Sequence, residues 1–110
     1  MATCSVYQKK VNSKGIAPIY IGFYLGRRKV EVPAKISISP DYFDKNKGII
    51  KSSYEYAKDK NLIISNIRAT INDIFVKYRL RDNELSLDLF WKEYRAYGTY
   101  TDLYHNHLIG

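Results

Sequence analysis

The chain has 110 residues, of which 45% are hydrophobic and 26% are charged, and its formal net charge is +7. This length corresponds to one domain with at most a short piece of a second, and the apolar content is that of an ordinary globular protein. The sequence has no signal peptide, no apolar run near the roughly 18 residues of a membrane span, and a single cysteine, Cys4, which together favour a reducing, cytoplasmic location.

The positive charge is concentrated in one segment of the chain. Residues 1–35 contain seven basic residues and one acid, Glu31, which gives a net charge of 7 − 1 = +6. The remaining residues contain 11 basic and 10 acidic side chains, a net charge of +1. A segment with so uniform a charge favours a polyanionic partner such as a nucleic acid.

Three strands are predicted within this basic segment. Residues 3–11 are rich in Val, Tyr and Thr, and a turn sequence follows them at residues 12–15. Residues 19–25 alternate strictly between apolar positions and Tyr or Gly, and residues 28–36 alternate again after a turn at Gly26. The pattern predicts a three-stranded antiparallel sheet with one apolar face and one face of Tyr, Lys and Arg.

Helical signals follow the sheet. Residues 39–41 (Ser-Pro-Asp) have the capping chemistry of a short helical turn, and residues 55–80 carry a helical period. We expect the apolar stripe of this long helix to pack on the apolar face of the sheet. The stripe consists of Leu62, Ile64, Ile67, Ile71, Ile74, Phe75 and Tyr78.

A second, shorter helix is predicted at about residues 87–97, with Ser86 as its N-cap and Gly98 at its end. The predicted fold class is therefore α+β: a three-stranded antiparallel sheet packed against a long α-helix, followed by a shorter helix. The predicted domain limits are 1–82 for the sheet and long helix, and 83–110 for the short helix and a tail.

The exposed face of the sheet, which we call the outer face, is the strongest candidate site. Basic side chains bind phosphates, guanidinium groups recognise guanine, and a sheet can enter the major groove of DNA. The alternative is a solvated face whose tyrosines merely favour strand formation, but soluble faces usually mix both signs of charge. We expect Glu31 at the rim of this face. The outer face consists of Tyr7, Lys9, Tyr20, Tyr24, Arg27 and Lys29.

Other candidate sites have simpler explanations. His105 and His107 form an H-x-H pair, but a disordered or truncated tail explains them better, and we predict no metal and no cofactor. Asp41 and Asp44 are better explained by capping and loop solvation than by acid–base chemistry. No set of residues suggests an enzyme. The aromatic residues of the second helix are expected to form core or an interdomain contact: Phe90, Trp91 and Tyr94.

Several segments occur in an order that resembles the N-terminal arm-type DNA-binding domain of tyrosine recombinases, the integrases of phages and conjugative transposons, in the branch common among Bacteroidetes. They are 14–21 (KGIAPIYI), 26–32 (GRRKVEV), 38–44 (ISPDYFD) with Lys47-Gly48, the helix from Asn61 to Phe75, and the helix start at 84–87. The resemblance covers roughly residues 3–95. Phe43 stands where this family usually has Trp.

The resemblance implies a bacterial, cytoplasmic protein that binds double-stranded DNA at arm-type sites with its sheet in the major groove. It makes the outer face groove-facing and adds Lys14 and Arg28 as candidate contacts to the DNA backbone. A complete recombinase also needs a core-binding domain and a catalytic domain, with an Arg/His/Arg set and a tyrosine nucleophile, which this length does not hold.

We therefore expect a non-catalytic fragment or a stand-alone relative, with residues 83–110 as a linker or the start of a core-binding domain. Other recombinase protomers would be contacted through the absent domains, and neither a membrane nor a small-molecule substrate is expected. Two alternatives remain open at this point. One is a double-stranded-RNA-binding module, and the other is a protein-interaction domain that binds an acidic partner.

Overall fold

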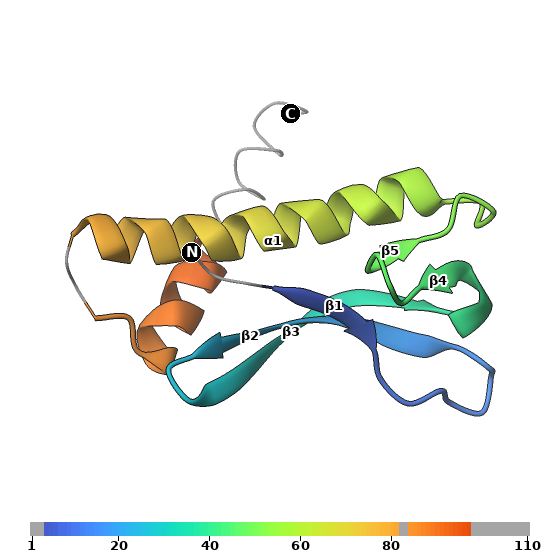
Figure 1. Ribbon diagram of the computed structural model, residues 1–110, viewed down its shortest axis with the longest axis horizontal. Helices are drawn as coiled ribbons and strands as arrows, with labels where there is room; N and C mark the ends of the chain where they lie inside the picture. The colour runs from blue at the N-terminus through green and yellow to red at the C-terminus, as the bar shows by residue number, and fades with distance from the viewer. Residues whose placement is uncertain (1–3, 82–83, 98–110) are drawn as a thin grey trace. The chain divides into compact units, whose positions relative to one another are not determined.

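The computed structural model describes residues 4–81 and 84–97, and its elements confirm the predicted α+β class. The chain divides into two units, with the boundary between Ala69 and Thr70 inside the long helix. The first unit holds the sheet and the beginning of that helix, and the second holds its end and the helix 87–97 (Figure 1). The domain limit predicted between residues 82 and 83 falls outside the described residues and stays a prediction.

The three predicted strands form one antiparallel sheet. They are β1 (Ser5–Gln8), β2 (Ala17–Leu25) and β3 (Arg28–Ile38), in the spatial order β1-β2-β3. The central strand β2 pairs with both neighbours, so its side-chain alternation determines which residues share a face with those of β1 and β3.

Both loops of the sheet have the turn chemistry that the sequence predicted. In the first loop, the Asn12 side-chain oxygen accepts a hydrogen bond from the Lys14 amide at 2.9 Å, and Gly15 has a φ of +79°. The second loop is the pair Gly26-Arg27, with Gly26 at a φ of +65° in the first position, as a type II′ hairpin requires. This short loop places Leu25 opposite Arg28 and so sets the register between β2 and β3.

The apolar face of the sheet is confirmed. Alternate side chains of β2 and β3 are no more than 5% exposed: Ala17, Ile19, Ile21, Phe23, Val30, Val32, Ala34, Ile36 and Ile38. This pattern provides one side of the core of the first unit. Burial of such side chains stabilises the fold by about 1.5–3 kcal/mol for each large residue.

A bulge interrupts the pairing of β3 with β2. From Tyr20 to Pro18, β2 advances two residues, whereas β3 advances four, from Pro33 to Ser37. Lys35 lies within the extra pair of residues and has a φ of +61°, a left-handed conformation that is uncommon for a side chain of this kind. Because the number of extra residues is even, the alternation of buried and exposed positions continues through the bulge.

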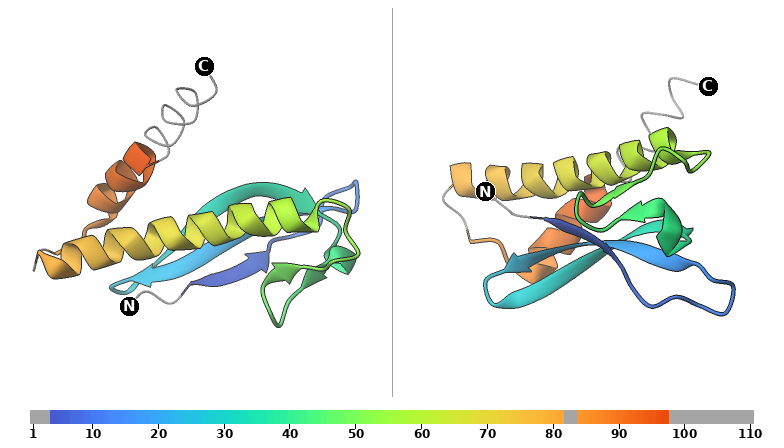
Figure 2. Two further views of the ribbon diagram at one scale, coloured as in Figure 1. Left: turned by 90° about the horizontal axis from the view of Figure 1, so that it is seen from above. Right: turned by 45° about the vertical axis from the view of Figure 1, so that its right-hand side comes forward.

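The short helical turn after the sheet also forms as predicted. Ser39 caps the 3₁₀ helix η1 (Pro40–Tyr42), because its hydroxyl accepts a hydrogen bond from the Asp41 amide at 3.3 Å. The segment that follows forms a small hairpin of β4 (Phe43–Asp44) and β5 (Ile49–Ile50), which the sequence did not predict, placed between the sheet and the start of the long helix (Figure 2).

Asp44 organises the turn of this hairpin. Its carboxylate accepts hydrogen bonds from the backbone amides of Asn46 at 3.0 Å and Lys47 at 3.1 Å, and Gly48 completes the turn with a φ of +66°. The prediction that Asp44 serves loop structure is therefore confirmed, and Asp41 lies in the first turn of η1, where its negative charge was expected.

The long helix α1 (Ala57–Leu80) agrees closely with the predicted range of 55–80. Within the first unit it lies over the sheet (Figure 1), with Ala57 and Ile64 buried. The predicted stripe is wrong at Leu62, which is 60% exposed. Successive helical residues are about 100° apart, so a residue two positions from Ile64 points to nearly the opposite side.

The second unit joins the end of α1 to the predicted helix 87–97. The Ser86 hydroxyl accepts a hydrogen bond from the Leu89 amide at 3.2 Å, which confirms Ser86 as the cap, whereas Gly98 lies outside the described residues. Lys77 and Glu93 form an ion pair between the two helices.

The aromatic cluster of the second helix is core, as predicted. Phe90 is fully buried, and its ring centroid lies 5.3 Å from that of Trp91 and 5.9 Å from that of Tyr94. Ile71 and Ile74, on the end of α1, are also fully buried.

A side chain of α1 connects the small hairpin to the helix by two hydrogen bonds. The Asn61 side-chain oxygen accepts a hydrogen bond from the Ile50 amide at 2.8 Å, and its nitrogen donates to the Ile50 carbonyl at 3.0 Å. Ile50 is 1% exposed, so both backbone groups are shielded by surrounding protein. Asn61 therefore pairs with β5 as a neighbouring strand would.

We predict that Asn61→Ala lowers the free energy of unfolding by about 2 kcal/mol, because it leaves two shielded backbone groups without partners. The higher helix propensity of alanine offsets only part of this loss of stability. Chemical denaturation monitored by circular dichroism measures the change. The control Ser65→Ala, at an exposed position of the same helix, should change stability by less than about 0.5 kcal/mol. Equal stability of the two variants would contradict the proposed role of Asn61.

Candidate nucleic-acid interface

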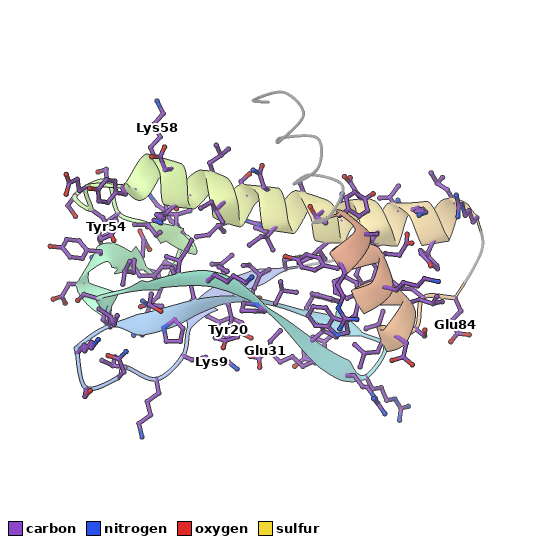
Figure 3. The ribbon with its side chains drawn as sticks, turned by 180° about the vertical axis from the view of Figure 1, so that it is seen from behind. Lys9, Tyr20, Glu31, Tyr54, Lys58 and Glu84 are labelled. Atoms are coloured by element: carbon purple, nitrogen blue, oxygen red, sulfur yellow. The ribbon has the colours of Figure 1, made fainter. Side chains whose placement is uncertain are left out.

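The strand pairing brings the predicted residues of β1, β2 and β3 to one face. Tyr7 lies opposite Tyr20, and Tyr24 lies opposite Lys29. Lys9 follows β1 directly, and its amide continues the ladder by donating to the Pro18 carbonyl at 3.0 Å. Figure 3 shows Lys9, Tyr20 and Glu31 on the side of the sheet away from α1.

The remaining predicted basic residues lie at the two ends of β2. Lys14 is exposed in the loop between β1 and β2. Arg27 is exposed in the two-residue loop at the other end, where strand pairing assigns it to neither face. Arg28 lies opposite Leu25 and next to Lys29, so it belongs to the apolar side of the hairpin end although it is exposed.

The backbone of Glu31 lies on the edge strand β3, as the predicted rim position requires, but its carboxylate reaches inward across the sheet. One carboxylate oxygen is 2.8 Å from the Lys9 amino group, and the other accepts a hydrogen bond from the Tyr7 hydroxyl. Both partners belong to the far edge of the sheet, two strands from Glu31. The register itself is as predicted, because the expected Tyr and Lys residues do share this face.

Gly22 explains how these side chains meet. It lies on β2 between Ser5 of β1 and Glu31 of β3, so the three residues form one row across the sheet. A Cβ atom at Gly22 would lie 2.7 Å from the Tyr7 hydroxyl oxygen, which is far too close. The absence of a side chain at Gly22 therefore lets the Tyr7 ring cross β2 and reach Glu31.

Two cation–π contacts add to this network. The Lys9 amino group is 4.1 Å from the centre of the Tyr20 ring, and the Lys29 amino group is 4.7 Å from the centre of the Tyr7 ring. Side chains from all three strands are thus held in defined positions before any ligand binds. Such ordering lowers the entropy that must be lost on binding.

The network sets the protonation states of its members. Hydrogen bonds from Lys9 and then from Tyr7 hold the pKa of Glu31 below its usual value, so the carboxylate is ionised at neutral pH. The hydrogen bond with Glu31 raises the pKa of Lys9. Burial, followed by the bond to Glu31, raises the pKa of the Tyr7 hydroxyl, which therefore keeps its proton and donates.

Sequence reasoning missed the bridging role of Glu31 and the need for Gly22. A signal was present, because Gly22 interrupts an outer-face series that is otherwise aromatic, between Tyr20 and Tyr24. A glycine inside a strand often marks a close approach of another group. The pattern alone does not say which side chain fills the space.

The other chemical candidates contribute nothing to this face. Cys4 is half-buried, and burial raises the pKa of its thiol, partly opposed by the positive charge of Arg68. Across residues 4–81 and 84–97, no group of three or more His, Cys, Asp or Glu is arranged to hold a metal ion. His105 and His107 lie outside the described residues. None of the described helices has the length and apolar character of a membrane span.

A small sheet with a helix over one face, and basic and aromatic side chains on the other, has the form of a nucleic-acid-binding domain. The family model of the Arm DNA-binding domain matches residues 5–90. The chain belongs to this family, which confirms the resemblance found in the sequence, and it is a DNA-binding domain. No curated protein and no solved structure matches it.

The network predicts a pH-dependent contribution to stability. Because the folded-state pKa of Glu31 is below its ordinary value of 4.5, its ion pair stabilises the fold above that pH and is lost as the pH falls through the lower folded value. The difference in melting temperature between the wild type and Glu31→Gln should therefore shrink as the pH falls below 4.5.

Thermal melts over a pH series measure this difference. The matched control Glu55→Gln removes a carboxylate from an exposed position outside the outer face, and its profile gives the effect of charge loss alone. A difference for Glu31→Gln that stays constant from neutral to acid pH would contradict the prediction.

Proposed function

We propose that the chain binds double-stranded DNA at arm-type sites, as the N-terminal domain of a tyrosine recombinase that acts in DNA integration and excision. Family membership supports DNA binding, and the ordered Tyr and Lys side chains of the outer face are the observation on which the choice of surface rests. The domain is not catalytic in this proposal. Catalysis and contacts with other recombinase protomers belong to other domains.

The dimensions of the sheet support insertion into the major groove. The central strand β2 has nine residues and spans about 26 Å at roughly 3.3 Å per residue. The major groove is about 12 Å wide and admits a β-ribbon. Strand ends that extend beyond the groove on both sides would bring Lys14, in the first loop, and Arg28, beside the second loop, to the two phosphate backbones.

The proposed roles follow from these positions. Lys14 and Arg28, in or beside the loops, contact phosphates, which contributes affinity without sequence preference. The outer face lies in the groove, where Tyr24, 66% exposed, and Lys29, exposed beside it, can reach base edges. Arg27 is the candidate for guanine recognition, because its guanidinium group matches the two acceptors of that base.

We predict that Lys14→Gln weakens binding to every duplex by a similar factor and reduces the slope of log K against log salt by about 0.9, the value for one phosphate contact. Lys58→Gln is the matched control, because Lys58 is exposed on α1 and points away from the sheet (Figure 3). Fluorescence anisotropy over a salt series gives both quantities. Equal losses of affinity in the two variants would indicate a response to net charge rather than the loss of a specific phosphate contact of Lys14.

We predict that Arg27→Ala costs about 1–3 kcal/mol with the preferred duplex and much less with a random duplex, because a base contact is lost. Competition binding with the two duplexes measures the ratio. Lys14→Gln, which should preserve that ratio, is the comparison. An unchanged preference in Arg27→Ala would remove Arg27 from the base-contacting set.

Duplex RNA tests the proposal as a whole. The A-form major groove is deep and narrow, so a sheet cannot enter it as it enters B-form DNA. Unlabelled duplex RNA should therefore compete poorly against labelled duplex DNA at equal salt. Failure to bind any DNA duplex at low salt would refute the proposed function.

A further inference from the structure

We infer that Glu31 is a specificity-determining residue that recognises cytosine, by accepting a hydrogen bond from the cytosine amino group in the major groove. The inference rests on the proposed binding of duplex DNA by the outer face. It goes beyond that proposal, because it assigns a base to one residue that charge alone would exclude from the interface.

Glu31 is an unexpected residue on a surface that binds DNA. It is the only acid among residues 1–35, and its carboxylate reaches from the edge strand β3 across the outer face to the side chains of Tyr7 and Lys9. A carboxylate on a surface that meets phosphates is repelled by them, although Lys9 offsets part of this repulsion. The lone pairs that Lys9 and Tyr7 do not engage lose their hydrogen bonds to water when DNA covers the surface, which costs free energy. A carboxylate in the middle of such a surface is compatible with tight binding when a donor of the DNA faces it.

Two donors fix the orientation of the Glu31 side chain. Lys9 contacts one carboxylate oxygen and Tyr7 contacts the other, and both reach it across the sheet, Tyr7 from β1 and Lys9 from the residue that follows β1. The Glu31 side chain remains 31% exposed, so the carboxylate is accessible to solvent while its direction is fixed. A rigid and accessible acceptor of this kind suits recognition of one donor in one place.

The Glu31 carboxylate can accept further hydrogen bonds. An ionised carboxylate has about four lone-pair positions. Among the described residues, Lys9 and Tyr7 donate hydrogen bonds to the Glu31 carboxylate. Its pKa is held below the usual value, so at neutral pH it accepts hydrogen bonds and donates none. The partner in the groove must therefore be a donor.

The chemistry of base edges selects cytosine. In the major groove guanine presents two acceptors, thymine presents an acceptor and a methyl group, and adenine presents an acceptor beside its amino group. Cytosine presents an amino donor and no acceptor, so it alone offers a carboxylate attraction without repulsion. A glutamine at the same position would instead match adenine, because its amide donates to one atom and accepts from the other.

Selection of bound duplexes from a randomised DNA pool tests the inference, with the wild type, Glu31→Gln and the control Glu55→Gln. We expect the wild type and the control to enrich one motif that contains a cytosine. Glu31→Gln should enrich the same motif with adenine at that position, and the preference between the two bases should change by about tenfold or more.

Tyr7→Phe keeps the carboxylate but removes one of the two groups that orient it. This variant should weaken the preference for cytosine without creating one for adenine. It also provides a test that does not depend on how Glu31→Gln folds, which circular dichroism monitors in both variants.

The outcomes separate the two proposals. A wild-type motif that reappears unchanged in Glu31→Gln, with equally altered affinity for all duplexes, would overturn the cytosine assignment and leave duplex binding intact. Glu31 would then serve only to order Tyr7 and Lys9. A wild type that enriches no duplex at low salt would overturn the proposed function and the inference together.

Discussion

The pairing of β2 with both of its neighbours is the constraint on which the first unit depends. A strand that is hydrogen-bonded on both sides cannot shift by one residue without moving all of its apolar side chains to the other face. The buried Ile19, Ile21 and Phe23 prevent that shift, since together they form much of the apolar face. The same pairing places the Tyr and Lys side chains opposite the helix, so the stability of the core and the composition of the outer face have one origin.

The outer face shows how an interface can be ordered without a ligand. Exposed ion pairs contribute little to stability on their own, because solvent screens them and long side chains lose entropy. Here the ion pair of Lys9 with Glu31 is combined with two ring contacts and a hydroxyl donor, so several side chains restrict one another. The network contributes more to a defined surface geometry than to folding free energy.

The elements with a strong local signal could be predicted from the sequence. Alternation revealed the three strands, and the helical period together with the capping serines located α1, η1 and the helix 87–97. The Tyr and Lys side chains of the outer face followed from the same alternation, whereas Arg27 lies in a loop outside the strand pairing, and the role of the set in DNA contact remains a proposal. Local patterns were sufficient here because each of these elements satisfies its own backbone hydrogen bonds or those of a sequence neighbour.

Features that depend on distant residues could not be predicted in this way. Leu62 was assigned to the buried stripe because it is apolar, although its angular position on the helix opposes that of Ile64. The hairpin of β4 and β5 has only two residues in each strand, and it depends on Asn61 of α1 for its backbone partners. Glu31 meets Tyr7 only because Gly22, on a third strand, leaves room for the ring.

The bulge in β3 has a consequence for how the length of the chain can vary. Two extra residues, around Lys35, keep Ile36 and Ile38 on the buried side of the sheet. Deleting one residue there would turn Ile36 and Ile38 to the solvent and bring their charged or polar neighbours inside, whereas deleting two would only straighten the strand. Insertions and deletions at this point should therefore be tolerated in pairs, so the even parity of the bulge defines which lengths of β3 are compatible with the fold.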